Sequence, residues 1–521
     1  MDAINIITFL GLFLSLLLAT NLFLSNKSSL KKNLPPSLPN SLPILGHLYL
    51  LKKPLHQSLA HLSAKHGPIL LLRFGIRPVL VVSSASLAEE CFTTNDATFA
   101  DRPRFPSVSV ITYNYTSLPF AAYGPDWREM RRIATIEALS CHRLAFFAYV
   151  LDDEARALVR HLFRNYGMVE LRPSLFGRLN VKFFISFLDY QLCQFSGKRY
   201  YGEDDGKDNV VYKFKEVIEK ITLLSGMTNV GDFLSAMIMW ITSQGVKRKM
   251  VRYHKYRDKI IQSLIEERRR KKREEDEDKK DGELKEKNRI NKTMIDALLS
   301  LQEKQPKQYT DVFIKALILS LISAGTDTSS NTIEWSMSLL LNNPDKLEKA
   351  RQEIEKQVGH DHLLDESDLT KLPYLHCIIN ETLRLYPVGP LLPHIARENC
   401  KVGGYDVDRG TMLLVNVYEI HRDPMLWLEP TKFVPERFQN VEVGGKLMSF
   451  GLGRRRCPGE GLGLKEVGLV LGTLIQCFEW KRIGPEKVDM TQGSGISMPR
   501  ANRLKALCSP REYMISLLSK L

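Results

Sequence analysis

The sequence lacks closely spaced residues of the kind that bind structural metals or form disulfide frameworks. Its eight cysteines are scattered over 521 residues, and none belongs to a C-x-x-C pair, the spacing typical of zinc knuckles. His56, His61 and His66 lie five residues apart; steps of about 500° around a helix scatter the rings, whereas a zinc pair uses positions i and i+4. We therefore expect no zinc site, and we interpret these histidines as surface and packing residues.

Basic stripes interleaved with aromatic residues are also lacking, although the formal net charge is +14. The densest basic run, RRRKKR at 268–273, is followed directly by EEDED at 274–278. Such a mixed-charge block is most simply a solvated helix end and loop. We therefore exclude nucleic acid as a partner, and the positive charge suits anionic lipid or an acidic protein instead.

Charge is missing from one long segment, Ala3 to Asn26. About twenty mostly apolar residues in a helix cross the roughly 30 Å hydrocarbon layer of a membrane. The segment is also longer than the roughly 7–15 residues of a cleavable signal core. We predict a membrane anchor helix within residues 1–26; the alternative is a buried core helix.

The flanks of this segment predict its orientation. Asp2 precedes it, whereas Lys27, Lys31 and Lys32 follow it, and positive charge tends to stay on the cytosolic side. Residues 27–46 form a basic and proline-rich hinge, because four prolines restrict the backbone there. The globular body, residues 47–521, is then cytosolic, where thiols stay reduced and disulfides are not expected.

Hydrophobic patterning in the body predicts a mainly α protein with small β-sheets, of the α+β class. Residues 70–84 (LLLRFGIRPVLVVSS) read as a β-hairpin. Helical periodicity dominates from about 125 to 390, and short strands with proline-punctuated loops follow from 391 to 450. No repeat of 20–50 residues is visible.

One predicted helix, Lys315 to Pro344, has a polar break in its apolar pattern. The stretch AGTDTSS, residues 324–330, places small and hydroxyl side chains in mid-helix, where they lower helix stability. Threonine hydroxyls compete for backbone carbonyls there, so we expect the helix to open locally. Asp327 beside Thr328 is a natural proton path; a tightly packed helix crossing with a capping Asp is the alternative.

A charged pair lies in an apolar context further along the chain. Glu381 and Arg384 occupy positions i and i+3 of NETLRLYPV, which places them on one helical face. Such a pair is often a surface contact of little energetic weight. The apolar surroundings nevertheless predict burial, which calls for a third partner, and Arg437 in FVPERF could supply it.

The stretch FGLGRRRCPG, residues 450–459, holds Cys457 behind three arginines and between glycines. Nearby cations and backbone N–H groups favour the thiolate, the form that ligates metals. Glycines let such a loop pass close to a flat cofactor, and a helical pattern follows over 462–478. The rival interpretation, a phosphate-binding loop, matches neither of its usual glycine patterns. We predict an axial metal ligand at a helix start.

Taken together, these motifs resemble the haem-thiolate monooxygenases of the cytochrome P-450 superfamily. The matching stretches are the Cys457 loop, AGTDTS, the Glu381-x-x-Arg384 pair, PERF at 435–438 and YGPDWREMRR, which contains Trp127 and Arg131. They occur in the family's order and span residues from about 35 to the end of the chain. The resemblance implies a cytochrome P-450 fold behind the N-terminal transmembrane helix.

The resemblance also implies a role for each matching residue. Cys457 would ligate the iron of haem b (heme b, iron protoporphyrin IX) and favour O–O cleavage. The haem propionates would be held by Trp127, Arg131, His394 and Arg455. Glu381, Arg384 and Arg437 would form a structural triad, and Asp327 and Thr328 would be catalytic residues that deliver protons to dioxygen.

Within the superfamily, the anchor and hinge resemble microsomal plant enzymes fed by NADPH–cytochrome reductase. This implies a single-pass protein of the endoplasmic reticulum membrane, in contact with lipid, that uses O2 and has a cytosolic catalytic domain. The stretches GKRYYGED (197–204), VGGYDVDRGTMLLVNV (402–417) and EIHRDPMLW (419–427) resemble the plant eighty-one family, whose members oxidise isoflavonoids, other flavonoids, lignans, benzophenones and indolic compounds. Two departures are the irregular FFISFLDYQL before Gly197 and the acidic Glu419, where a small residue is usual.

By family position, the substrate pocket would be walled by four mostly apolar segments with scattered hydroxyls: residues 104–118, 320–324, 388–392 and 493–497. Such a lining suits an apolar aromatic phenol. We expect hydroxylation, with oxidative ring closure as a further outcome, of an isoflavone, flavone, lignan or benzophenone. The alternatives are an indolic, terpenoid or fatty-acid substrate, a reductase-independent haem-thiolate isomerase or dehydratase, and a non-enzymatic haem binder.

Overall fold

A computed structural model of the chain describes most of the body. The described residues are 32–146, 148–171, 244–278, 293–439, 446–493 and 497–521, with the isolated pieces Gly11, Phe214, 216–218, 220–221, 230–234 and Gly495. The predicted anchor, apart from Gly11, and the stretch 197–204 lie outside these residues.

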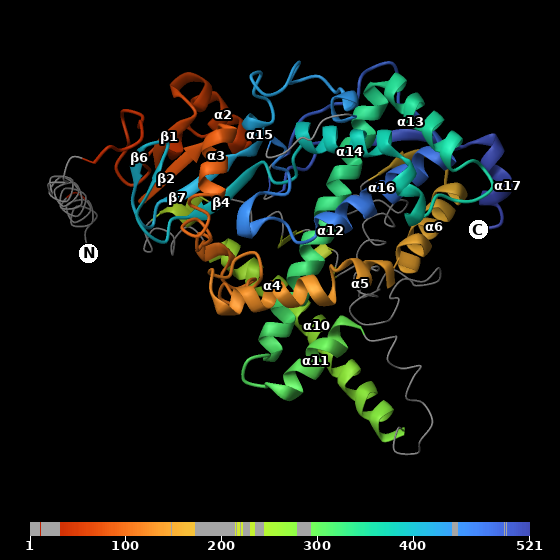
Figure 1. Cartoon of the computed structure of the whole chain (residues 1–521), viewed down its shortest axis with the longest axis horizontal. Helices are drawn as coiled ribbons and strands as arrows, with labels where there is room; N and C mark the ends of the chain where they lie inside the picture. Colours follow the sequence, from red (N-terminus) through yellow and green to blue (C-terminus); the bar gives the residue numbers. More distant parts are fainter. Residues whose placement is uncertain are drawn as a thin grey trace, which may run out of the picture.

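Helices make up most of the regular structure, as the sequence predicts (Figure 1). The α-helices of the described residues are α2 (Leu55–His66), α3 (Ala85–Phe92), α4 (Pro125–Glu137), α5 (Cys141–Phe146), α6 (Ala148–Arg164), α10 (Gln244–Asp278), α11 (Met294–Lys304), α12 (Asp311–Asn342), α13 (Pro344–Gln357), α14 (Pro373–Leu385), α15 (Val417–Ile420), α16 (Glu460–Cys477) and α17 (Ile515–Leu518). Short 3₁₀ turns include η7 (Pro435–Phe438) and η9 (Gly453–Arg455).

The strands form three small sheets. They are β1 (Ile69–Phe74), β2 (Arg77–Val82), β3 (Gly167–Glu170), β4 (Leu391–Ile395), β5 (Cys400–Val402), β6 (Tyr405–Val407), β7 (Met412–Asn416), β8 (Phe478–Arg482) and β9 (Lys505–Pro510). The sheet orders are β1-β2-β7-β4, β3-β9-β8 and β5-β6. The predicted hairpin is confirmed, because β1 and β2 pair antiparallel with Ile69 opposite Val82.

The largest sheet joins the two ends of the body. β2 pairs in parallel with β7, and β7 pairs antiparallel with β4. In Figure 1 this sheet lies beside α2 and α3, on the side of the molecule away from α13 and α17. The sheet therefore brings β4, which carries His394, next to strands from the start of the body.

Helix α12 crosses the middle of the molecule (Figure 1). Thr310 caps its start by accepting a hydrogen bond from the Phe313 amide, and it ends at Asn342, just before Pro344. The helix is long and apolar enough to cross a membrane, but 56% of its most apolar stretch is buried inside the protein. It is therefore a core helix, and the predicted span of 315–344 is close to the observed one.

The expected local opening of α12 is wrong. The helix is continuous through residues 324–330, although Thr326, Thr328 and Ser330 donate to the carbonyls four residues earlier, at 2.7–2.8 Å. A carbonyl oxygen has two lone pairs, so each hydroxyl adds a second hydrogen bond without displacing the helical amide.

The basic run 268–273 also differs from the prediction. It continues α10, but it is not purely solvated, because three of its cations pair with acids of α11 and of the start of α12. The pairs are Arg268 with Asp296, Arg269 with Asp311, and Lys272 with Glu303. Much of this charge therefore holds helices together.

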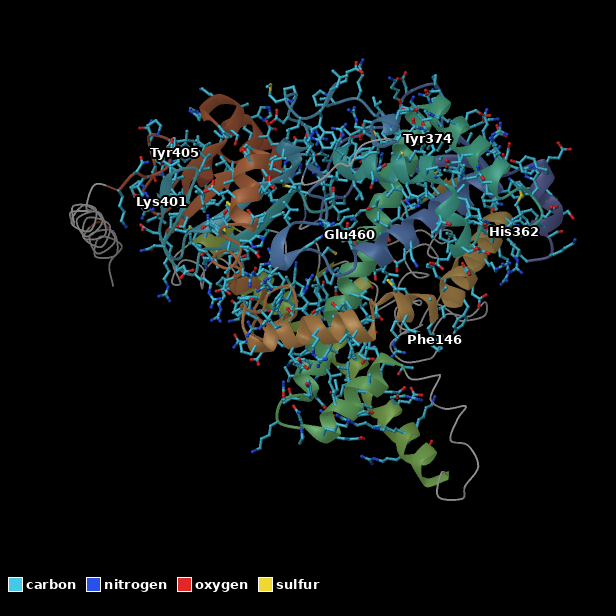
Figure 2. All side chains as sticks on the ribbon, viewed as in Figure 1. Phe146, His362, Tyr374, Lys401, Tyr405 and Glu460 are labelled. Carbon is cyan, nitrogen blue, oxygen red and sulfur yellow. The ribbon has the colours of Figure 1, made fainter. Side chains whose placement is uncertain are left out.

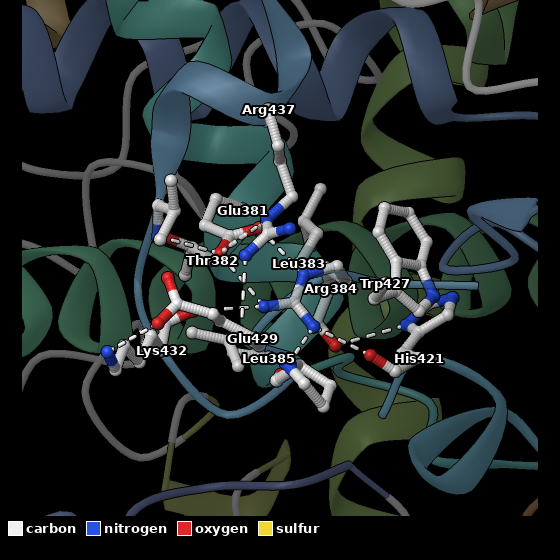
Figure 3. A network of polar contacts seen from close by, with 12 residues as sticks. Glu381, Thr382, Leu383, Arg384, Leu385, His421, Trp427, Glu429, Lys432 and Arg437 are labelled. Atoms are coloured by element: carbon white, nitrogen blue, oxygen red, sulfur yellow. Dashed lines mark hydrogen bonds and ion pairs between the residues drawn. The ribbon is translucent and has the colours of Figure 1, made fainter. Parts of the chain in front are cut away.

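A buried ion pair connects α14 to the chain that leads into the cysteine loop (Figure 3). Glu381 and Arg384 are 0% exposed, and their two parallel hydrogen bonds measure 2.7 and 2.8 Å. Arg437 Nε lies 3.1 Å from the same carboxylate. The structure thus brings the three predicted residues together, and Val434 N–H adds a further bond of 2.8 Å to Glu381.

Further contacts of this network extend toward the cysteine loop. Arg384 donates to the backbone carbonyls of His421 and Pro430, both at 2.7 Å. His421 donates from Nδ1 to the Arg384 carbonyl and accepts the Met448 amide on Nε2 at 2.9 Å. Burial lowers the pKa of His421 to about 3, which matches this neutral ring. The network therefore positions Met448, close before Phe450 and the loop.

We predict that Arg384→Ala lowers the free energy of unfolding by about 3–5 kcal/mol, because Glu381 would be left as a buried charge without its closest partner. Chemical denaturation of the purified protein measures this loss. Lys432→Ala is the control: Lys432 pairs with Glu429 at the surface, and such pairs contribute no more than about 1 kcal/mol. Equal losses in the two variants would show that the buried pair is dispensable.

Candidate active site

The loop around Cys457 has a backbone that requires glycine. Gly451 and Gly453 have φ of +72° and +64°, in the left-handed region. A Cβ added to Gly453 would lie 2.4 Å from Asp96 Oδ1 and 2.7 Å from the Phe92 carbonyl oxygen. The loop therefore packs directly against the end of α3, and the Cys457 amide closes it by donating to Phe450 at 2.8 Å.

Protein atoms lie close around Cys457, but solvent still reaches its side chain. Its side chain is exposed, yet nearby protein atoms desolvate the thiol and raise its pKa; the Gly459 amide, Arg131 and Arg456 act in the opposite direction. It lies just before α16, whose first residue, Glu460, is near the middle of the molecule in Figure 2. The structure thus places an accessible thiol at a helix start, as the sequence predicts.

A group of desolvated cations lies close to this loop. The Arg455 guanidinium is 4.1 Å from the centre of the Trp127 ring, and Arg131, one helical turn along α4, is 5.6 Å from it. Burial, followed by repulsion from Arg102, lowers the pKa of Arg455 to about 9, and Arg131 contributes to the same effect. The structure therefore brings Trp127, Arg131 and Arg455 together and adds Arg102.

Only some of the hydrogen-bond donors in this group of side chains bind an acceptor in the described part of the protein. Arg455 donates to the Ala100 and Ala121 carbonyls, both at 2.6 Å, but its Nη1 atom is buried and has no partner among the described residues. The Trp127 indole N–H donates to the Leu118 carbonyl at 3.1 Å. Trp127 therefore contributes its ring face to the group, and Arg455 Nη1 is a buried donor without a partner among the described residues.

His394 on β4 completes this set. Its Nδ1 donates to the Phe99 carbonyl at 2.6 Å. Burial, then Arg102 and to a smaller degree Arg455, hold the pKa of His394 well below its usual range, against the opposing hydrogen bond to Phe99. An anion bound beside these guanidiniums would favour a protonated His394.

These residues fit haem b. Its iron takes a soft sulfur ligand, and its two carboxylates would compensate cations that otherwise repel one another; the buried, unpartnered Nη1 of Arg455 is the observation that calls for such an anion. Arg102 was not predicted, because nothing in DRPRF distinguishes it from an arginine that lies at the surface.

One face of α12 is open at the polar stretch. Ala324 and Thr328 are exposed, although most residues around them in this helix are buried. Asp327 is 5% exposed and points elsewhere, because its Oδ2 accepts from Ser497 Oγ at 2.6 Å and from Asn331 Nδ2 at 3.2 Å. The two predicted proton-delivering residues are thus adjacent in the chain but contact different partners.

A buried acid that the sequence did not reveal joins α12 to α16. Ser329 donates to Glu466 Oε2 at 2.8 Å, and Glu466 is fully buried. Burial raises the pKa of Glu466 to about 8 against the opposing effect of Ser329, so the acid is mostly neutral at pH 7. A single Glu in the apolar run following Cys457 was the available signal.

Hydrogen bonds connect some residues of the segments predicted to wall the pocket. The Leu118 amide donates to Ser320 Oγ of α12 at 3.2 Å, which joins the first two segments. The Met498 amide, next to the segment 493–497, donates to the Val388 carbonyl at 2.9 Å. Leu118 is thus bonded to α12 at Ser320, and Ser497 is bonded to α12 at Asp327.

Comparisons with known proteins agree with this geometry. Residues 36–505 match the family model described as cytochrome P450. Cytochrome P450 81Q32 from Catharanthus roseus is 47% identical over 482 residues, which is 92% of each chain. (+)-Piperitol/(+)-sesamin synthase CYP81Q2 from Sesamum radiatum is 43% identical, covering 91% of this chain and 90% of its own.

Isoflavone 3'-hydroxylase from Medicago truncatula is 45% identical, covering 89% of this chain and 90% of its own. A zebra fish cytochrome P450 solved with abiraterone has the same fold, with a TM-score of 0.71 and 23% identity, and the match covers 88% of this chain and all of that one. The chain therefore belongs to the cytochrome P450 family, among the plant 81 members, and is a haem-binding monooxygenase.

Proposed function

We propose that this monooxygenase hydroxylates a plant phenolic compound, such as an isoflavone, flavone, lignan or benzophenone, and that it can also close a ring oxidatively. The observation that carries the proposal is the open Ala324–Thr328 face of α12, beside wall segments that are mostly apolar with scattered hydroxyls. A flat aromatic molecule with few polar groups suits such a lining. The printed names of relatives, isoflavone hydroxylases and a sesamin synthase, support the same substrate class.

The electron supply and location are part of the proposal. The uncharged segment Ala3–Asn26 with its lysine-rich flank favours a single-pass anchor in the endoplasmic reticulum membrane, with the body in the cytosol. An NADPH–cytochrome reductase in the same membrane would then supply electrons.

Each site residue would have a distinct task. Cys457 would hold the iron, while Arg131, Arg455 and His394 would hold the carboxylates against the Trp127 face. When bound, haem supplies the reductive activation of O2 and the oxidation of substrate. Thr328 Oγ1, on the open face of α12, would pass on a proton, and the buried Asp327 would then supply Thr328 with a new proton.

We predict that Cys457→Ala abolishes the thiolate-type Soret band of the reduced, CO-bound protein, because no other ligand would push electron density onto the iron in the same way. Difference spectra of equal amounts of folded protein measure this. Cys141→Ala, which also removes an exposed thiol, should keep the band. A Cys457→Ala protein with the unchanged band would refute the assignment.

We predict that Thr328→Ala keeps full haem content but diverts reducing equivalents to peroxide, because a positioned proton donor contributes roughly 10²–10⁴-fold to a proton-transfer step. Product, peroxide and NADPH consumption are measured together with reductase. Thr332→Ala is the matched control, because the Thr332 hydroxyl also donates to the carbonyl four residues earlier but is buried. Normal product per NADPH in Thr328→Ala would count against the relay.

Substrate class can be tested with membranes that contain this protein and reductase. We expect turnover of at least one flavonoid, isoflavonoid, lignan or benzophenone, and product formation that requires NADPH. Turnover of fatty acids, terpenes or indoles alone would end the phenolic proposal. Conversion of a peroxide without reductase would favour the isomerase or dehydratase alternative.

A further inference from the structure

The buried carboxyl of Glu466 lies where two helices of the candidate site pack together. α16 begins just after the Cys457 loop and carries Glu466 on its buried side. α12, which packs against α16 (Figure 1), carries the polar stretch 324–330. Ser329 of this stretch donates to Glu466 Oε2 at 2.8 Å. A polar contact therefore joins the helix that follows the sulfur ligand to α12, at the residue next to Thr328.

The surroundings of Glu466 disfavour a negative charge. The residue is 0% exposed, and its second oxygen, Oε1, is buried without a partner among the described residues. The helix around it contributes Val467, Leu469 and Val470 to the large apolar core. An ionised carboxyl has about four acceptor positions to satisfy, and burying such a charge without a cation is far less favourable than burying the neutral acid. The geometry therefore favours a protonated Glu466.

Neighbouring elements supply no counter-charge to this acid in the described part of the chain. α16 packs against α6, α12, α13, α14 and the 3₁₀ turn η6 (Glu366–Lys371). The buried charged groups on these elements are Glu154 of α6, Asp327 and Glu334 of α12, Glu381 and Arg384 of α14, and Asp368 of η6. None of them contributes to the pKa of Glu466, which burial raises to about 8 against the opposing effect of Ser329.

The protonation state of Glu466 affects how α12 and α16 fit together. A neutral acid and a serine hydroxyl share a hydrogen bond in either direction, whereas a carboxylate only accepts. Ionisation would place an uncompensated charge in the apolar contact between the two helices. Water would have to enter or the helices would have to shift to solvate it, and Thr328 would move with its helix.

We propose that Glu466 is a positioning residue that works as a neutral acid. By binding Ser329, it holds the polar stretch of α12, including Thr328, at a fixed place relative to α16 and the Cys457 loop. The inference rests on the proposed function in one respect, the proton transfer by Thr328. It adds a residue that contacts neither substrate nor iron and acts on proton delivery through the packing of two helices.

The first test asks whether the folded protein holds a proton on Glu466. Its pKa is raised from 4.5 to about 8 in the folded protein, so unfolding releases this proton between these pH values, and the wild-type protein loses stability as the pH rises through this window. Glu466→Gln keeps an acceptor for Ser329 but cannot ionise. We expect the unfolding constant of the wild type, relative to Glu466→Gln, to rise about tenfold per pH unit within the window and to level off above it.

Glu479→Gln is the control for this measurement. Glu479 is exposed on β8, directly after α16, and pairs with Lys481 at 2.9 Å. Chemical denaturation of the holoproteins at a series of pH values gives both ratios. The ratio of wild type to Glu479→Gln should stay nearly constant. A ratio to Glu466→Gln that is equally constant would overturn the inference, because Glu466 would then be ionised in the folded protein.

The second test measures peroxide formed per NADPH with reductase, which a purely structural role would not make dependent on pH. We expect the wild-type value to rise several-fold above pH 8, where Glu466 ionises, and the Glu466→Gln value to stay low. Ser329→Ala should raise peroxide several-fold already below that pH. Ser338→Ala is its matched control, because the buried Ser338 donates to the Glu334 carbonyl within α12 at 2.6 Å, and it should behave as wild type.

The two tests separate this inference from the proposed function. Equal peroxide in Ser329→Ala and Ser338→Ala would overturn the role of the contact and leave the monooxygenase assignment intact. Should Glu466→Gln fail to fold, this pair of serine variants decides alone. A normal product yield in Thr328→Ala would refute the proton relay, and the unfolding ratios would still decide whether Glu466 joins the helices as a neutral acid.

Discussion

The burial of a full charge at Glu381 is the constraint on which the rest of the structure depends. This carboxylate is shielded from water, so protein donors must compensate it, and they come from α14 itself, from Arg437 and from the backbone at Val434. Arg384, which satisfies most of this requirement, also binds carbonyls of the chain between α15 and η7. Because His421 of that chain also accepts the Met448 amide just before the cysteine loop, the ion pair on α14 contributes to the position of this loop.

Two features of the haem site are unfavourable when no haem is bound, and haem would offset both. Desolvation raises the pKa of the Cys457 thiol, although a metal ligand must be a thiolate. Burial, and after it repulsion from Arg102, lowers the pKa of Arg455 near Trp127. A bound iron would stabilise the Cys457 thiolate and the two haem carboxylates would compensate the arginines, so haem would stabilise the folded site as well as supply its chemistry.

Local patterns could predict much of this molecule. The hairpin β1–β2, the bounds of α12 and the glycine-dependent loop before α16 follow from side-chain periodicity and from backbone freedom, which a short stretch of sequence displays. The opening expected in α12 did not occur, because the hydroxyls of Thr326 and Ser330 share carbonyls with the helix. Arg102 and Ser497 could not be recognised, since their importance arises from neighbours that are distant in the chain, whereas Glu466 left a signal as the single Glu of the apolar run 462–478.

The way residues 491–493 and 497–501 are attached to the rest of the protein has a consequence for how such a protein can change during evolution. Several of their attachments use backbone atoms: the Met498 carbonyl accepts from Trp335, the Met498 amide donates to Val388, and the amides of Gly493 and Ala501 donate to Pro499 and Thr491. Any amino acid offers these atoms, apart from the missing amide of proline. Where the backbone alone makes the attachment, the side chain can change without loss of that attachment, so substitutions at such positions can accumulate while the framework around Cys457 is kept.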